Sequence, residues 1–318
     1  MLRVAFRVDI SSSIGMGHYM RMSVLAEAFT ELGCSCSFFT GKDEPVDYSG
    51  FNVVVLDTYQ INDAYIFSLK NPGRLLVCYD DNALYTYDCD ILLNANFHAK
   101  ELDFQFVGEA PQMLLGAQYA LLRREFRDGS LITVKEKSTR IFVCFGGSDL
   151  RNFTLTAIRA TRDISDVYLH VVLGAYTQCD SEVYEFAADN IKIHKTPSSM
   201  YDIMQQCDIA VAAAGSMVYE LAAIGLPTIV IPQADNQNMI AKYLESNNLM
   251  KWLGNWNSVD EKTLGAEAES LLGNFVRRKS ESRLLSQSVN RSGALKSAKS
   301  ILNHKILLSK YTNEGREY

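Results

Sequence analysis

The chain carries Gly15-Met16-Gly17-His18-Tyr19-Met20-Arg21 between a short apolar run and a longer periodic segment. The run before it, Val4-Ala5-Phe6-Arg7-Val8, has the composition of a buried strand. Apolar residues then recur every four positions, at Met20, Val24, Ala28 and Leu32. This period indicates an amphipathic helix. The stretch therefore predicts a strand, a glycine turn and a helix, the first unit of an α/β domain.

His18 follows the carboxyl end of this predicted strand. Ligands of open α/β sheets bind beyond the carboxyl ends of the strands, so His18 is expected to face a ligand. The positive end of the helix disfavours a protonated imidazole, and a neutral imidazole is a competent base near pH 7. Arg21 lies one helical turn later on the same face. The alternatives are a structural histidine and an ion pair of Arg21 with an acidic neighbour such as Asp9.

Length and composition favour a soluble two-domain enzyme. The 318 residues exceed a typical single core, and 47% hydrophobic with 21% charged residues is ordinary for a globular protein. No apolar run reaches bilayer length, and Asp9 interrupts the segment that a signal peptide would need, so we expect a cytoplasmic protein. The seven cysteines form no C-x-x-C pair and the five histidines are dispersed. We therefore predict reduced thiols, no metal site and no cofactor.

Charge is distributed unevenly along the chain. Residues 1–136 hold 11 Lys and Arg against 18 Asp and Glu, residues 137–270 hold 10 against 16, and residues 271–318 hold 10 against 3. We interpret the basic end as helices that pack on the acidic body through Leu295, Ala298, Ile301 and Leu302. Nucleic-acid or anionic-lipid binding is the alternative. Because aromatic residues are not interleaved with the basic ones, we expect no nucleic-acid partner and no membrane insertion.

Strand-like runs recur throughout the chain and divide it into two domains. They are 53–56, 75–79 and 91–93 in the first half, and 140–145, 167–173, 191–193, 209–213 and 228–231 in the second. Their separations suit crossover helices, which implies parallel, doubly wound sheets. The polar segment 127–139 is interpreted as the linker. We therefore predict an α/β protein with two Rossmann-like doubly wound domains, 1–136 and 137–318, facing across a cleft.

Two glycine loops of the second domain are typical of phosphate binding. In Gly215-Ser216-Met217-Val218-Tyr219-Glu220 a strand gives way to a helix, with Ser216 at or near the N-cap. Backbone N–H groups and the helix dipole there suit phosphate oxygens, and Glu220 is placed to accept hydrogen bonds from a ribose diol. Phe145-Gly146-Gly147-Ser148-Asp149 follows another strand in the same way, and two such loops suggest a diphosphate. An ordinary helix cap is the alternative.

Polar side chains also follow several predicted strands. They are Asp80, Asp81, Asn82, Asn94 and Asn96 in the first half, and Gln233, Asp235, Asn236 and Gln237 in the second. Carboxylates and amides at strand ends suit sugar hydroxyls, although solvated turns contain the same residue types.

Six motifs occur in one order along residues 1–245. They are Gly15–Arg21, Tyr79-Asp80-Asp81, Cys89–Asn96, Gly116–Phe126, Gly146–Asp149 and Gly215–Glu220. In this order they resemble the UDP-2,4-diacetamido-2,4,6-trideoxy-β-L-altropyranose hydrolases of pseudaminic acid biosynthesis, a pathway of flagellin and cell-surface glycosylation. Arg124 stands where that family often has an acidic residue.

The resemblance implies a GT-B fold, related to the lipid II-forming peptidoglycan glycosyltransferase. It also implies that water attacks the anomeric carbon of the UDP-sugar with inversion, releasing UDP and 2,4-diacetamido-2,4,6-trideoxy-L-altrose. His18 would activate the water, Ser216 and Glu220 would hold the diphosphate and ribose, and the backbone of Met200 would meet uracil. The predicted substrate-binding residues are Gly17, Arg21, Asp81, Asn94, Tyr119, Arg123, Gly147, Ser148, Met200, Gly215, Ser216, Met217, Glu220, Asn236 and Gln237.

Two other functions fit the same motifs: a GT-B glycosyltransferase with a UDP-sugar donor, and a non-catalytic nucleotide-sugar binding protein. A lipid acceptor would favour a basic or apolar docking patch on the first domain, yet that domain is acidic. His18 with its flanking glycines argues against a mere binding protein. We expect a monomer whose partner is the small-molecule UDP-sugar.

Overall fold

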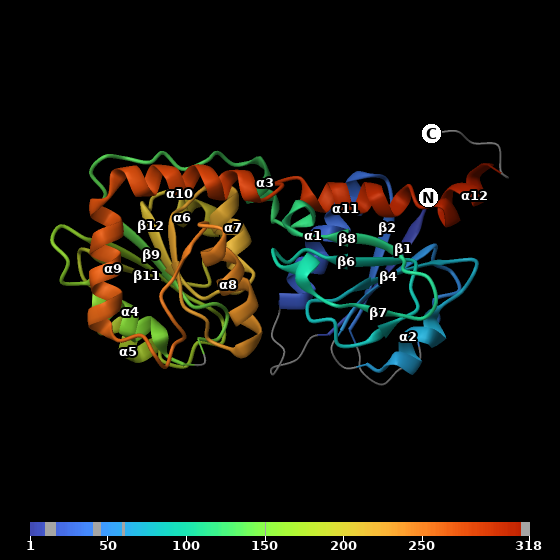
Figure 1. The fold of residues 1–318 in the computed structure, drawn as a ribbon, viewed down its shortest axis with the longest axis horizontal. Helices are drawn as coiled ribbons and strands as arrows, with labels where there is room; N and C mark the ends of the chain where they lie inside the picture. Colours follow the sequence, from blue (N-terminus) through green and yellow to red (C-terminus); the bar gives the residue numbers. More distant parts are fainter. Residues whose placement is uncertain (10–16, 41–45, 59–60, 150, 313–318) are drawn as a thin grey trace. The chain divides into compact units, whose positions relative to one another are not determined.

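The structure is a computed structural model that describes residues 1–9, 17–40, 46–58, 61–149 and 151–312. It divides into two compact units (Figure 1): unit 1 comprises Met1–Arg123 with Asn290–Tyr318, and unit 2 comprises Arg124–Val289. Gly15 and Met16 of the predicted turn lie outside the described residues, whereas Gly17 begins helix α1 (Gly17–Glu31).

Unit 1 is built on a six-stranded parallel sheet in the order β2-β1-β3-β4-β6-β8. The strands are β1 (Arg3–Val8), β2 (Ser35–Phe39), β3 (Val53–Asp57), β4 (Leu75–Tyr79), β6 (Ile91–Asn94) and β8 (Gln112–Leu115). Every residue of β3, β4 and β6 is buried, as their continuous apolar runs predict for a sheet covered on both faces. The smaller elements are α2 (Asp63–Leu69), the 3₁₀ turns η1 (Ala99–Glu101) and η2 (Ala117–Tyr119), and a parallel pair β5 (Thr86–Tyr87) and β7 (Gln105–Phe106).

Helix α1 buries Val24 and Ala28 of the predicted period, with Leu32 partly buried against the same core, but its buried face does not include Met20. Met22, Leu25 and Phe29 are fully buried in the core that includes Phe6, whereas Met20 is 46% exposed. Met22, Leu25 and Phe29 are spaced three and four residues apart and form the middle of the buried face. The packing of the helix against the sheet decides which residues take this position. The first apolar residue of a period is therefore not always part of the buried face.

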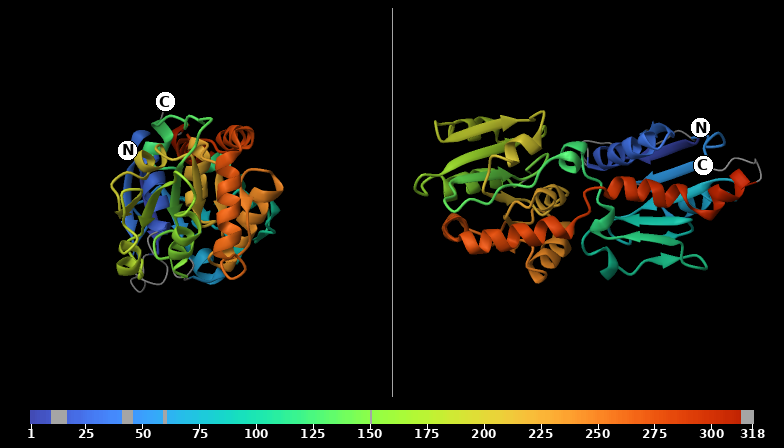
Figure 2. Two further views of the ribbon diagram at one scale, coloured as in Figure 1. Left: turned by 90° about the vertical axis from the view of Figure 1, so that its left-hand side faces the viewer. Right: turned by 90° about the horizontal axis from the view of Figure 1, so that it is seen from above.

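The basic end of the chain is divided between the units: residues 271–289 belong to unit 2, and residues 290–318 belong to unit 1. Helix α11 (Gly293–Leu302) lies beside α1 (Figures 1 and 2), and α12 (Lys305–Thr312) follows it. Ala298 and Ile301 are fully buried in the same core as α1, and Leu295 and Leu302 are partly buried against it. At the start of α11 a Cβ on Gly293 would lie 2.4 Å from the carbonyl oxygen of Ala120, so this position requires glycine. The packing confirms the interpretation of this end as amphipathic helices on the body of the protein.

Unit 2 holds a second parallel sheet, in the order β11-β10-β9-β12-β13-β14 (Figure 1). The strands are β9 (Arg140–Cys144), β10 (Tyr168–Leu173), β11 (Ile191–Lys195), β12 (Ile209–Ala212), β13 (Thr228–Val230) and β14 (Lys251–Trp252). The helices are α3 (Arg124–Asp128), α4 (Phe153–Thr161), α5 (Asp180–Tyr184), α6 (Met200–Met204), α7 (Met217–Ile224), η3 (Asp235–Gln237), α8 (Asn238–Ser246), α9 (Glu261–Gly273) and α10 (Phe275–Ser288). Alternate residues of β9, such as Ile141 and Val143, pack against α4 and α9.

The compact units differ from the predicted domains in two places. Residues 124–136 are part of unit 2, where the N–H of Ile132 donates to the carbonyl of Ile224 (2.9 Å). The buried guanidinium of Arg278 donates to the carbonyls of Lys135 (2.8 Å) and Glu136 (3.1 Å). Backbone hydrogen bonds fix this polar segment without apolar periodicity. Residues 290–318, assigned by prediction to the second domain, return to unit 1 because their apolar face completes its core.

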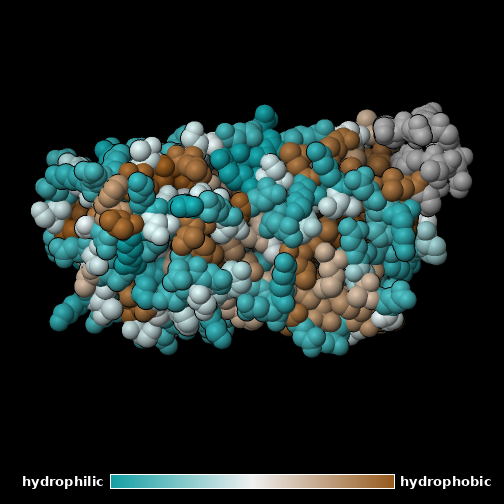
Figure 3. All heavy atoms as spheres, turned by 45° about the horizontal axis from the view of Figure 1, so that its top comes forward, coloured by the Kyte–Doolittle hydropathy of each residue, from teal (hydrophilic) through white to brown (hydrophobic). Residues whose placement is uncertain are grey.

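Exposed apolar side chains are scattered, with hydrophobic residues in separate patches on the face drawn in Figure 3. No helix of the described residues is long and apolar enough to cross a membrane. All seven cysteines are free thiols, six of them buried.

Candidate functional site

His18 is the second residue of α1 in unit 1 and is held by a carboxylate that ends β3. Its Nδ1 lies 2.6 Å from Oδ1 of Asp57, and both side chains are buried. Nη2 of Arg21 lies 2.9 Å from the same Nδ1. In the tautomer with the proton on Nδ1, this nitrogen donates to Asp57 and Nε2 carries the basic lone pair. The contact with Asp57 fixes the orientation of the imidazole.

Arg21 joins Asp57 to a second carboxylate. Its Nε donates to Oδ2 of Asp57 (2.6 Å), its Nη2 to Oδ1 of Asp57 (2.5 Å) and its Nη1 to Oδ2 of Asp81 (2.5 Å). The guanidinium also stacks over the ring of Tyr79, 4.1 Å from the centroid. Burial alone would lower the pKa of Arg21, but Asp57 and Asp81 outweigh it and hold that pKa well above its ordinary value. The ion pair of Arg21 with an acidic neighbour, considered as an alternative, is present, but its partners are Asp57 and Asp81. Asp9, the suggested partner, accepts a hydrogen bond from the hydroxyl of Thr58.

The loops after β4 and β6 are tied to this network. Asp81 accepts a hydrogen bond from Nδ2 of Asn96 (2.9 Å), and the N–H of Asn96 donates to Oδ1 of Asn94 (2.8 Å). Asp80 forms a turn, the alternative to a sugar contact. Its carboxylate accepts hydrogen bonds from the N–H groups of Asn82 and Ala83. Burial raises the pKa of Asp80.

Three other predicted residues of unit 1 lie at different places. Gly17 is exposed, with open space where a Cβ would project. Tyr119 is partly buried in η2, where the ammonium of Lys296 from α11 lies 4.9 Å from its ring centroid. Arg123 is the last residue before the chain enters unit 2.

In unit 2, the N-terminus of α7 presents unused donors. Ser216 is the N-cap, as predicted, but its exposed side chain makes no capping hydrogen bond. Among the hydrogen bonds of the described residues, the N–H groups of Ser216 and Met217 take no part. Glu220 lies in the first turn and is partly buried. Open N–H groups at a helix N-terminus suit an anionic oxygen.

The second glycine loop is shaped differently. Asp149 is buried, and its carboxylate accepts from the N–H groups of Phe153 and Thr154 (2.9 Å each), so it caps α4 itself. Gly146 has a φ of +85°, and a Cβ on Gly174 would lie 2.3 Å from the carbonyl oxygen of Gly147. The loop is thus held by close backbone packing, with Gly147 exposed and Ser148 partly exposed.

The remaining predicted residues of unit 2 differ in where they lie relative to the start of α7. The amide Nε2 of Gln237 lies 3.7 Å from where a Cβ on Gly215 would be, so the loop after β13 reaches the start of α7. Asn236 is exposed in η3. Met200 is buried at the start of α6, where Ser199 caps the helix.

The chain is similar to several known proteins, two of which are named as UDP-sugar hydrolases. Residues 141–294 match the glycosyltransferase family 28 C-terminal domain. Over 273 residues the chain is 27% identical to the UDP-2,4-diacetamido-2,4,6-trideoxy-beta-L-altropyranose hydrolase of Campylobacter jejuni, covering 76% of this chain and 96% of that protein. It is 26% identical over 275 residues to an uncharacterized protein of Methanocaldococcus jannaschii, covering 74% of this chain and spanning only 57% of that relative. A Helicobacter pylori protein named pseudaminic acid cytidylyltransferase and UDP-2,4-diacetamido-2,4,6-trideoxy-beta-L-altropyranose hydrolase is 25% identical over 279 residues, with 83% of this chain and 49% of that protein covered.

Solved structures with the same architecture are glycosyltransferases. Acinetobacter baumannii MurG superposes with a TM-score of 0.67 at 13% identity, over 96% of this chain and all of that one. The spinosyn rhamnosyltransferase SpnG complexed with thymidine diphosphate gives 0.61 at 13% identity, over 94% of this chain and all of that one. This chain has the GT-B fold. The GT-B assignment confirms the predicted fold class, and the relatives confirm the predicted resemblance to the altropyranose hydrolases.

Asp57 is the site residue of this GT-B protein that sequence reasoning missed. It ends the apolar run Val53–Leu56, as Asp80 and Asp81 follow the next strand. The rule that polar residues at strand ends form sites applies equally to it. Its role is visible only once the parallel pairing of β1 with β3 brings Asp57 beside the start of α1.

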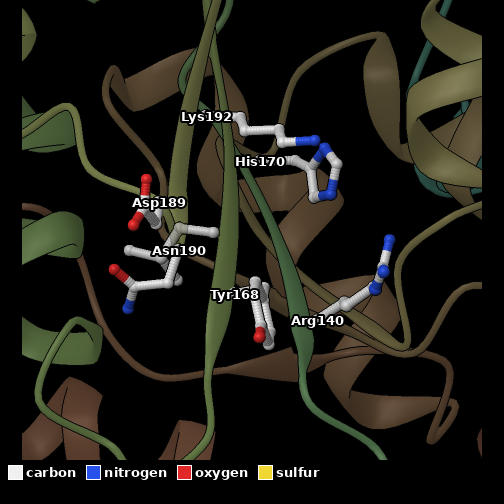
Figure 4. A pocket seen from close by; sticks show the side chains of 7 residues that line it. Arg140, Tyr168, His170, Asp189, Asn190 and Lys192 are labelled. Carbon is white, nitrogen blue, oxygen red and sulfur yellow. The ribbon is translucent and has the colours of Figure 1, made fainter.

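A small cavity of about 110 Å³ in unit 2 lies apart from all predicted residues (Figure 4). Arg140, Tyr168, His170 and Lys192 line it at the amino-terminal halves of β9, β10 and β11. The phosphate-type loops of this GT-B protein follow the carboxyl ends of its strands instead. The cavity therefore lies at the opposite ends of the strands from the loops predicted to bind the nucleotide.

Proposed function

We propose that this GT-B protein is a hydrolase that cleaves the anomeric C–O bond of UDP-2,4-diacetamido-2,4,6-trideoxy-β-L-altropyranose. The observation that carries the proposal is the buried His18–Asp57 pair at 2.6 Å, which fixes a basic nitrogen at the carboxyl ends of the unit 1 strands. The resemblance to hydrolases of this substrate supports the same reaction.

In this reaction His18 acts as general base. Nε2 takes a proton from water while the water oxygen forms a bond to the anomeric carbon, and the C–O bond to UDP breaks with its electron pair on the diphosphate. Attack from the face opposite UDP inverts the anomeric configuration. Asp57 holds the Nδ1 proton and stabilises the imidazolium that forms. UDP is a good leaving group, so the mechanism needs no carboxylic acid to protonate it.

Unit 2 would bind the nucleotide. The N–H groups of Ser216 and Met217 and the loop at Gly147 and Ser148 would meet diphosphate oxygens. Glu220 would accept hydrogen bonds from the ribose diol. The other predicted contacts are Met200 at uracil, and Gly215, Asn236 and Gln237 around the start of α7. Asp81, Asn94, Tyr119, Arg123, Gly17 and Arg21 would contact or orient the sugar in unit 1. We propose a cytoplasmic monomer, which size-exclusion chromatography with light scattering would check.

A glycosyltransferase is the second candidate, favoured by the structural neighbours. The purified protein is incubated with the altro-configured UDP-sugar alone and followed by proton NMR. Release of UDP with the inverted anomer formed first supports the hydrolase. Release only after an alcohol acceptor is added identifies a transferase, and binding without release in either case identifies a binding protein. A retained anomer would contradict direct attack by water.

A further inference from the structure

His98 is a buried histidine that the proposed chemistry does not use. It follows β6 in the run Asn94-Ala95-Asn96-Phe97-His98, and it is 3% exposed. Its Nδ1 is inaccessible and has no hydrogen-bond partner among the described residues. A buried polar atom left unpaired costs about 1–3 kcal/mol, and native structures retain few of them. Such an atom is available to a group from outside the chain, either an ordered water or a polar group of a ligand.

The surroundings of His98 keep its ring neutral. Burial lowers the pKa of His98, and this effect exceeds the opposing attraction of Glu101 and Asp81. A neutral imidazole has one N–H donor and one acceptor nitrogen. Its acceptor nitrogen suits an uncharged N–H or O–H donor, which a fully ionised phosphate does not offer.

A second unpaired atom occurs in the same run. Asn94 is fully buried, and its Oδ1 accepts from the N–H of Asn96, but its Nδ2 has no partner among the described residues. This Nδ2 is a donor, whereas the imidazole of His98 can accept. One donor and one acceptor match the carbonyl and N–H of a secondary amide.

Asn94 is connected to His18 through a hydrogen-bonded series, which begins where its Oδ1 accepts from the N–H of Asn96. Asn96 donates to Asp81, Asp81 accepts from Arg21, and Arg21 donates to Asp57, the partner of His18. Asp81 is also near enough for its charge to act on the ring of His98. The loop after β6 therefore belongs to the same hydrogen-bonded network as His18.

We propose that His98 and Asn94 form a subsite that recognises an acetamido substituent of the sugar, and that His98 determines specificity for it. The inference rests on the proposed function, since it assumes that the substrate is an N-acetylated UDP-sugar. Asn94 would donate to the acetamido carbonyl and His98 would accept from the acetamido N–H. Neither residue takes part in bond cleavage.

The test compares wild type with His98→Leu, His98→Asn and the control His304→Leu, which removes a histidine of unit 1 that follows α11. The substrates are the diacetamido UDP-sugar and its two analogues with a free amine at C2 or at C4. We expect His98→Leu to raise KM for the diacetamido substrate about 10-fold or more, with kcat within about threefold and an unchanged Kd for UDP. His98→Asn should restore part of the loss, and His304→Leu should leave KM unchanged. On one of the two amine analogues, wild type and His98→Leu should have equal kcat/KM.

A change in the thermal midpoint with no change in KM would mean that His98 has only a structural role, and would overturn the proposal. So would an equal loss on all three substrates. If His98→Leu does not fold, His98→Asn against the amine analogues decides in the same way. If the wild type does not hydrolyse the substrate, the proposed function fails separately. The affinity ratio of UDP-sugar to UDP, measured calorimetrically in wild type and variants, then tests the subsite.

Discussion

At the scale of single residues, the site of unit 1 depends on how charge is arranged around one imidazole. Asp57 and Asp81 carry two negative charges against the one positive charge of Arg21. The surplus lies beside His18, where it stabilises an imidazolium formed as water loses its proton. Because Arg21 contacts both carboxylates and the ring of Tyr79, the arrangement is held rigidly before substrate binds.

Asp57→Asn should lower kcat by about 10²- to 10⁴-fold, because an asparagine can hold the imidazole in the wrong tautomer. His18→Asn should lower kcat over a similar range and leave the Kd for UDP nearly unchanged. The double variant should be no slower than His18→Asn alone, since both residues act as one unit. Steady-state kinetics measures kcat, and calorimetric titration measures the Kd for UDP. The control is Asp88→Asn, a half-exposed carboxylate of unit 1, and a full additive loss in the double variant would contradict the pairing.

Glu220→Ala should weaken UDP binding about 10- to 150-fold, because a charged acceptor contributes about 1.5–3 kcal/mol for a hydrogen bond. Calorimetric titration with UDP, without any sugar, isolates this effect. Glu269→Ala on the exposed face of α9 is the matched control. An unchanged Kd for Glu220→Ala would show that the ribose is held elsewhere.

At the scale of elements, two helices of unit 2 begin after glycine loops but differ in what their N-termini contact. The start of α4 is occupied by the carboxylate of Asp149, which uses the donors that an anion would need. The start of α7 has an N-cap side chain that makes no such bond. Of the two helices, only α7 therefore has an N-terminus that the chain does not cap with a side chain, which keeps it the predicted anion site.

Two neighbouring strands of unit 2 carry a pH-sensitive pair. His170 on β10 and His194 on β11 stack with ring centroids 5.5 Å apart, and Nδ1 of His170 lies 3.3 Å from Nε2 of His194. Burial, then His194, Arg140 and Lys192 lower the pKa of His170 to about 4, and burial also lowers the pKa of His194. The unfolded chain therefore binds protons at a higher pH than the folded one.

Unit 2 should lose about 2 kcal/mol of stability as the pH falls from about 6.5 to 4, and little of this loss should occur above pH 7. Both tryptophans of the chain, Trp252 and Trp256, lie in unit 2, so urea unfolding followed by tryptophan fluorescence reports this unit. His170→Gln should flatten the pH dependence, while His304→Gln should not. Equal slopes for wild type and His170→Gln would contradict the assignment.

At the scale of the whole molecule, unit 1 is completed by the end of the chain. The chain leaves this unit at Arg123 and returns at Asn290. Ala294, Ala298, Ile301 and Leu307 then enter a core whose other members come from residues 4–114. The first 123 residues alone therefore lack one side of their core.

Deleting residues 290–318 should destabilise unit 1 but not unit 2. Loss of a single large buried aliphatic side chain costs about 2–5 kcal/mol, so removing four buried apolar residues approaches the whole stability of a typical domain. Limited proteolysis should cut within residues 1–123, while the tryptophan transition of unit 2 keeps its midpoint. Leu308→Ala, at a 49% exposed position, is the control. Protease resistance of the truncated unit 1 would refute the role of α11.

The sequence by itself determined the fold class, nine of the strands and the residues at their ends. Apolar runs and glycine turns are local signals, and local backbone preferences decide where such strands and helices form. Only the tertiary structure decided that Asp57 contacts His18, that Asp149 caps α4, and that residues 290–318 join unit 1. Each of these depends on strand pairing or on helix packing between segments far apart in the chain. No spacing rule within the sequence encodes which carboxylate reaches which imidazole, because that distance exists only after the sheet has formed.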